Sequence, residues 1–165
     1  MDENKIIKTD EDVIVVEEGY KLIKIQNELG EQVGVFRFNP TDINIVNRYN
    51  EIAPKFQEAL KGVENAGVDE NGEGTDEESI EILNEAEEKI IELLDYMTKS
   101  DSRSAFFSRT HMFTPVGGNF YCENVLVQLG AFISKKFDAE IQAVNNRVEK
   151  HIHGYRTGKH RKGDR

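Results

Sequence analysis

Apolar side chains recur at helical spacing along the last long segment of the chain, residues 119–153. Their later intervals are 4, 4, 3, 4 and 4 residues, which places them on one face of an α-helix. An unbroken helix of this length would extend roughly 50 Å at about 1.5 Å per residue. A domain of this size cannot easily cover so long an apolar face with its own core. We therefore expect the part beyond Ala139 to pack against another helix, which a second copy of the chain could supply.

The N-terminal part of the chain predicts a small β-sheet. Residues 12–17, 20–27 and 32–38 are rich in β-branched or alternating apolar side chains. The connections between them are short and contain Gly19 and Gly30, and glycine readily adopts the positive φ of tight turns. We expect a three-stranded antiparallel meander with a helix on its apolar face, because such a sheet is marginally stable alone.

Two further helices are predicted from start signals and spacing. Residues 39–42 (Asn-Pro-Thr-Asp) are typical of a helix N-terminus, with Asn39 as the cap. Apolar residues then recur from Ile43 to Leu60, and Pro54 should kink or split this helix. Residues 75–78 form a capping box before an apolar stripe that ends near Met97, on a helix whose outer face is almost all glutamate.

These elements predict an α+β fold, mainly α, in one domain. Residues 1–62 form the meander and the first helix, 63–75 an acidic flexible linker, and 76–154 the helical region. Within the helical region, residues 102–119 should form a short helix and a turn, and Asn119 should cap the long helix that follows. Gly154 should end the long helix, which leaves residues 155–165 as a basic disordered tail. Three to four helices therefore follow the meander.

Charge is unevenly distributed along the 165 residues. Residues 1–100 carry 25 acidic and 10 basic side chains, whereas residues 101–165 carry 6 acidic and 11 basic, which gives the net charge of −10. The acidic part disfavours nucleic acid as the main partner. One cysteine excludes a disulfide framework within the chain, and no stretch approaches the ~18 apolar residues of a membrane span. We expect a cytoplasmic protein without a signal peptide or membrane segment.

The residues that could support chemistry do not form a recognisable catalytic or metal site. His111 lies near Ser108 in sequence but has no acidic residue at an informative spacing. Cys122 lies among aromatic residues, which favours a core or interface role. His151 and His153 are two residues apart and do not share a helix face. We expect no enzyme activity, no metal and no cofactor.

Several stretches resemble one known family. They are the meander end and helix start at 36–43, the helix that follows, the acidic linker, Phe106-Phe107, the segment 114–121 and Val125-Leu126. Over about residues 20–135 the chain resembles the tail assembly chaperones encoded by siphophages and prophages of Gram-positive hosts. The long C-terminal helix and the basic tail depart from that pattern.

The resemblance implies a non-enzymatic, mostly helical protein of the host cytoplasm that self-associates into a homo-oligomer. Family members keep the long tape measure protein soluble and bring it to the tail tube subunits during tail morphogenesis. The apolar stripe of the long helix would then bind the client. The candidate partner-binding residues are Val125, Leu129, Phe132, Phe137, Ile141, Val144 and Val148.

Two other functions stay open at this stage. One is a structural virion component, such as a tail or head–tail connector subunit. The other is a small nucleic-acid-associated regulator that binds electrostatically through the basic tail, without base readout. The same tail would also suit an acidic protein partner. Its candidate residues are Arg156, Lys159, Arg161, Lys162 and Arg165.

Overall fold

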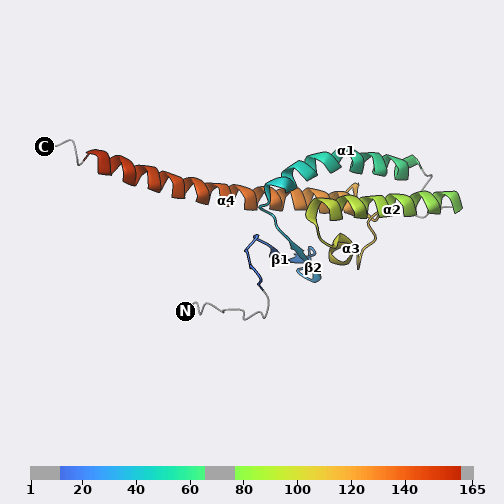
Figure 1. Ribbon diagram of the computed structural model, residues 1–165. Helices are drawn as coiled ribbons and strands as arrows, with labels where there is room; N and C mark the ends of the chain where they lie inside the picture. The colour runs from blue at the N-terminus through green and yellow to red at the C-terminus, as the bar shows by residue number, and fades with distance from the viewer. Residues whose placement is uncertain (1–11, 66–76, 161–165) are drawn as a thin grey trace.

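The computed structural model describes residues 12–65 and 77–160, with side chains described as far as Val148. The helices are α1 (Ile43–Asn65), α2 (Glu77–Thr98), α3 (Ser102–Phe106) and α4 (Tyr121–His160). One antiparallel hairpin consists of β1 (Lys21–Gln26) and β2 (Gln32–Phe38), and a second, very short one of β3 (Pro115–Val116) and β4 (Asn119–Phe120). Figure 1 shows α1, α2 and the first half of α4 side by side, with β1 and β2 beneath them. The predicted mainly helical fold with a small N-terminal sheet and a long last helix is confirmed.

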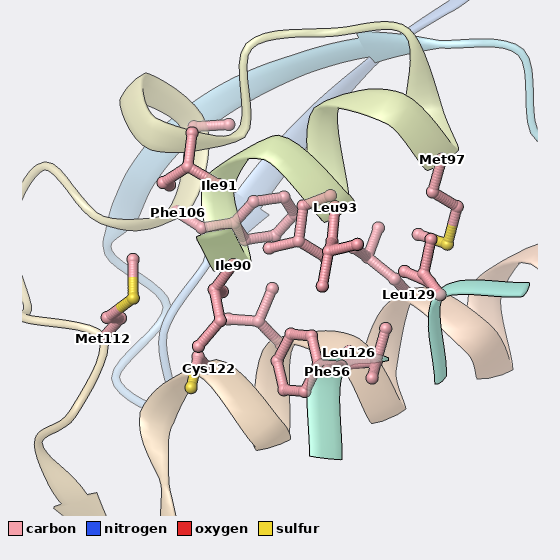
Figure 2. Packing of buried hydrophobic residues seen from close by; sticks show 14 of the residues in the cluster. Phe56, Ile90, Ile91, Leu93, Met97, Phe106, Met112, Cys122, Leu126 and Leu129 are labelled. Carbon is pink, nitrogen blue, oxygen red and sulfur yellow. The ribbon is translucent and has the colours of Figure 1, made fainter. Parts of the chain in front are cut away.

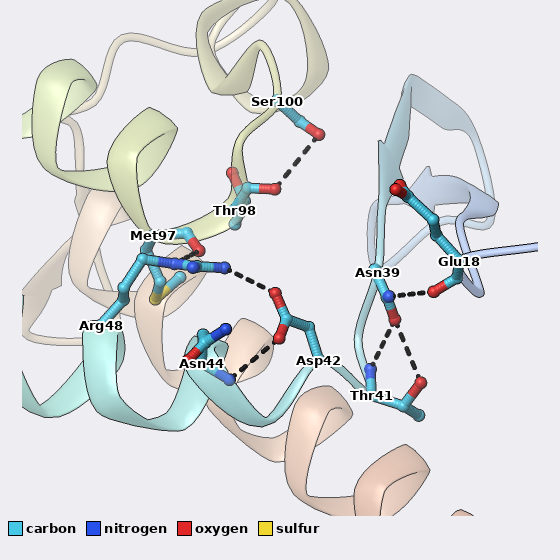
Figure 3. Close-up of polar contacts among 9 residues, drawn as sticks. All are labelled: Glu18, Asn39, Thr41, Asp42, Asn44, Arg48, Met97, Thr98 and Ser100. Carbon is cyan, nitrogen blue, oxygen red and sulfur yellow. Dashed lines mark hydrogen bonds and ion pairs between the residues drawn. The ribbon is translucent and has the colours of Figure 1, made fainter. Parts of the chain in front are cut away.

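The prediction of a three-stranded meander is wrong in its first strand. β1 and β2 pair as expected, with Ile23 opposite Phe36, but residues 12–17 are extended and unpaired. The two-residue turn at Glu18 and Gly19 does not fold back, because the side-chain amide of Asn39 donates a hydrogen bond to the Glu18 carbonyl (Figure 3). That contact holds the chain against the end of β2 instead of returning it along β1.

The start of α1 is capped by a residue other than the predicted one. The side chain of Asp42 accepts a hydrogen bond from the Asn44 N–H at 3.0 Å, whereas Asn39 accepts from the Thr41 N–H in the preceding turn (Figure 3). As a result α1 begins at Ile43, which is later than a cap at Asn39 would place its start. Ile45 is buried in the core, whereas Ile43 is exposed.

α1 is one helix despite its internal proline. Pro54 lies on the exposed side of the helix, where water can bind the carbonyl that the proline ring leaves without an N–H partner. The helix also continues to Asn65, and Val63 is fully buried, so residues 63–65 are not part of a linker. The rest of the predicted linker and the first half of the capping box lie at 66–76, outside the described residues.

The main core forms where α1, α2 and α4 meet. Phe56 of α1, Ile90 and Leu94 of α2, and Leu126 of α4 are among its buried members (Figure 2). Figure 2 also shows Ile90 next to Cys122 and Phe56 next to Leu126, so each helix contributes to one continuous cluster. Burial of this apolar surface is the largest favourable contribution to folding.

Polar contacts fix α1 and α2 as an antiparallel pair. Arg48, near the start of α1, donates from Nε to the carbonyl of Met97, near the end of α2, at 2.8 Å. Its guanidinium also pairs with Asp42 at 3.2 Å (Figure 3). On the same side, the Tyr96 hydroxyl donates to Glu51 at 2.9 Å. The carbonyl at the C-terminal end of α2 is therefore satisfied by a side chain of α1.

The hairpin is attached to the helices through its aromatic face. The ring of Phe36 lies 5.0 Å from that of Phe106 in α3, and Phe38 lies 6.0 Å from Phe132 in α4. Gly34 lies so close to α3 that an added Cβ would come within 2.3 Å of the Ala105 carbonyl oxygen. Glycine is therefore required at this point of β2 for steric reasons.

The predicted short helix and turn before α4 are confirmed. Asp101 caps α3 by accepting from the Ser104 N–H at 3.1 Å, and Gly117 and Gly118 adopt positive φ in the turn of the β3–β4 hairpin. The predicted cap of α4 is wrong, because Asn119 lies in β4 and Glu123 instead accepts from the Phe120 N–H at 2.7 Å.

α4 also ends later than predicted. It continues through Gly154 to His160, so at least residues 155–160 of the expected disordered tail are helical. A glycine within a helix costs only about 1 kcal/mol relative to alanine, and no proline follows to stop the helix.

Two glycine substitutions should have opposite effects on stability. Gly34→Ala forces β2 away from α3 and should lower the free energy of unfolding by about 1–3 kcal/mol. Gly62→Ala, in α1 with no atom within 4 Å of the new Cβ, should raise it by about 0.5–1 kcal/mol. Urea denaturation followed by far-UV circular dichroism measures both. A neutral Gly34→Ala would contradict the close packing of β2 on α3.

Candidate partner-binding surface

α4 consists of a part inside the body and a part outside it. Val125, Leu126, Leu129 and Ile133 are buried against α1 and α2, and Ile133 is the last buried residue of α4 among the side chains described, which end at Val148. All the side chains from Asp138 to Val148 are exposed. In Figure 1 this second part extends away from the other elements. The 23 residues 138–160 correspond to about 34 Å of helix beyond the body.

The second part of α4 carries a narrow line of apolar side chains, which we call the projecting face. It consists of Phe137, Ile141, Val144 and Val148, at intervals of 4, 3 and 4 residues. At 3.6 residues per turn these positions fall within about 60° of the helix circumference. Phe137 is half-buried, while the other three are 45%, 43% and 43% exposed, respectively. Within the described structure this face has no element packed on it.

The predicted partner-binding residues are divided between the two parts of the helix. Val125 and Leu129 are buried in the protein's own core and cannot contact a partner in this fold. Phe132 is half-buried against Phe38, with the Lys136 ammonium 5.5 Å from its ring centre. The other four predicted residues form the projecting face. The five basic residues predicted for the tail lie beyond the last described side chain.

The projecting face continues into a hollow between α4 and α1. The hollow has a volume of about 350 Å³ and is lined by Val46 and Tyr49 of α1 and by Gly130, Ile133 and Phe137 of α4, among others. Gly130 allows this approach, since a Cβ there would lie 3.0 Å from the Tyr49 hydroxyl oxygen. The two α1 residues were not predicted as part of the site because their spacing also suits a core stripe.

Charges of both signs lie on either side of the projecting face. At helical spacing Glu140 and Arg147 share one side of the line and Asp138 lies on the other, all three exposed. α2, in contrast, presents mostly carboxylates to solvent, including Glu81, Glu85, Glu88 and Glu92. A partner helix with mixed charges could therefore lie along α4 without meeting a surface of a single sign.

His111 has an acidic neighbour that the sequence did not indicate. Its Nε2 lies 3.4 Å from a carboxylate oxygen of Glu87 in α2, and its Nδ1 accepts from the Phe113 N–H at 3.1 Å. Glu87 also pairs with Arg103 of α3 at 3.0 Å. These contacts connect α2 to the segment that follows it, so His111 takes part in a polar cluster at the surface.

Among the described residues, no group of three His, Cys, Asp or Glu side chains could hold a metal ion. None of the described helices has an apolar stretch long enough to cross a membrane.

No protein-family model, curated protein or solved structure matches the chain.

Alanine substitutions should distinguish the two parts of α4. Ile133→Ala removes buried core volume and should lower the free energy of unfolding by about 2–5 kcal/mol. Ile141→Ala, eight residues further along the same helix, should change it by less than about 0.5 kcal/mol because the side chain is exposed. Chemical denaturation of the two variants provides the comparison. Equal losses would mean that Ile141 is also covered.

The thiol of Cys122 should be unreactive in the folded protein. Burial, with a smaller contribution from the neighbouring Glu123, raises the pKa of Cys122 to about 12, so the thiolate is almost absent at pH 8. We expect slow reaction with Ellman's reagent in buffer and rapid reaction in guanidinium, where the thiol is solvated. Fast labelling of the native protein would contradict the burial of this residue.

Proposed function

We propose that this protein is a non-enzymatic assembly factor that binds a helical segment of another protein along the projecting face of α4. The observation that carries this proposal is the uncovered apolar line Phe137, Ile141, Val144 and Val148 on a helix that leaves the body. Contiguous apolar surface that folding leaves exposed is typical of sites for protein partners.

The shape of the surface favours a helix as the bound element. Intervals of 4, 3 and 4 residues match the a and d positions of a coiled coil, where side chains of one helix fit between those of another. The hollow beside Tyr49 extends this surface onto the body, so a bound helix could contact α1 as well as α4. An extended strand or a compact globular face would use this narrow line less completely.

The resemblance to tail assembly chaperones supplies the identity of the client. We propose that the client is the tape measure protein of a siphophage or prophage, a long helical chain that requires a soluble carrier before it reaches the tail tube subunits. The strongly acidic surface of α2 suits that role, because net charge keeps a complex with an apolar client in solution. The protein would act in the host cytoplasm, without a cofactor.

Co-expression with the tape measure protein tests the proposal. The wild-type chain should keep the tape measure protein soluble and co-purify with it. Ile141→Glu/Val144→Glu places two charges in the proposed contact and should reduce the co-purified client by about tenfold or more. Val127→Glu is the matched control, since Val127 is an exposed apolar residue of the same helix within the body.

Two outcomes would overturn this assignment. A tape measure protein that stays insoluble and never co-purifies with the wild-type chain removes the chaperone role. Mass spectrometry of purified particles provides the second measurement, because a chaperone should be missing from mature tails. Detection of the chain at a stoichiometric level would instead identify a structural subunit of the virion.

A further inference from the structure

The segment before β1 is apolar on both sides and pairs with no strand among the residues that the structure describes. Residues 12–18 are extended, and the four side chains Val13, Ile14, Val15 and Val16 are 51%, 89%, 71% and 72% exposed, respectively. Successive side chains of an extended chain point in opposite directions, so neither side of this segment is covered. A run of β-branched residues that is apolar on both sides is typical of a strand inside a sheet rather than of a free segment.

β1 offers an edge to which such a strand could be added. In the described structure β1 pairs only with β2, so the backbone groups on its other side have no strand partner. The solvent face of the hairpin includes two exposed apolar side chains, Leu22 at 72% and Val35 at 42%, beside the charged Lys24 and Arg37. An added strand would cover part of that face with one set of alternate side chains and approach Ile23 and Ile25 with the other.

The charges of the segment and of the edge are complementary. The four apolar residues lie between Asp12 on one side and Glu17 and Glu18 on the other, whereas β1 presents Lys21 and Lys24. All five charged side chains are exposed. Pairing of two such acidic segments with each other would bring like charges together, while pairing of a segment with β1 brings opposite charges together.

We propose that residues 12–18 of one copy add to the open edge of β1 in a second copy, and that the exchange is reciprocal. The partner is another molecule because Asn39 holds Glu18 at the end of β2 and the segment does not fold back onto its own β1. The resulting contact closes a two-fold dimer whose interface lies on the β-hairpin, apart from the projecting face of α4. It therefore does not depend on the proposed function.

Light scattering coupled to size-exclusion chromatography tests this contact on the full chain. The wild type should run as a dimer. Val15→Pro removes a backbone donor from the added strand and should weaken the dimer by about tenfold or more. Because Val15 is exposed and lies in no helix or strand of its own copy, the circular dichroism spectrum should not change. Val15→Thr keeps a β-branched residue and every backbone donor, and should remain dimeric.

Charge reversal provides a second, independent measurement. Lys21→Glu/Lys24→Glu makes both the segment and the edge acidic, while Asp12→Lys/Glu17→Lys makes both basic. Each variant alone should therefore be monomeric. An equimolar mixture restores opposite charges at both contacts and should form a heterodimer.

The outcomes separate this contact from its alternatives. A wild type that is monomeric at about 100 µM would overturn the proposal. A strand from another protein would then be the remaining occupant. A dimer that survives Val15→Pro would also overturn it and would place self-association elsewhere, for example on α4. Monomeric variants whose mixture fails to pair would overturn the assigned charge contacts. Dimers lost in each variant and regained in the mixture support the exchange.

Discussion

The shared core of α1, α2 and α4 determines where the other surfaces of this protein lie. Phe56, Ile90 and Leu126 belong to one buried cluster, and that cluster ends at Ile133 although α4 continues to His160. The described side chains from Asp138 to Val148 are all exposed and add nothing to this cluster. That part of α4 is therefore maintained by its own backbone hydrogen bonds or by a partner.

The β1–β2 hairpin is held in place by side chains that pack into the same core. β2 contacts the helices through Phe36 and Phe38, while β1 reaches the core only with its partly buried isoleucines. One side of the sheet is thus anchored and the other is open. Two separate places in the described structure carry uncovered apolar surface, the projecting face and the edge of β1 with the segment before it. The first is helical and the second is extended, so each suits a different kind of partner.

The sequence was most informative where side-chain periodicity and local turn signals agreed. The helical pattern of the last segment predicted α4, and the glycines of the β1–β2 and β3–β4 connections predicted turns that the structure contains. Predictions failed where a long-range contact decided the outcome. Asn39 binds Glu18 instead of capping a helix, and this tertiary contact cannot be inferred from spacing. Similarly, periodicity placed Val125 and Ile141 on one helix without showing which of them the body would cover.

The length of the free part of α4 has an electrostatic consequence. At physiological ionic strength the field of a charge decays over a Debye length of about 8 Å, and the helix extends about 34 Å beyond the body. Salt therefore screens most of this arm from the glutamates of α2. A molecule that approaches its far end responds to the charges of the arm itself, which the sequence makes more basic than the rest, and not to the overall charge of −10.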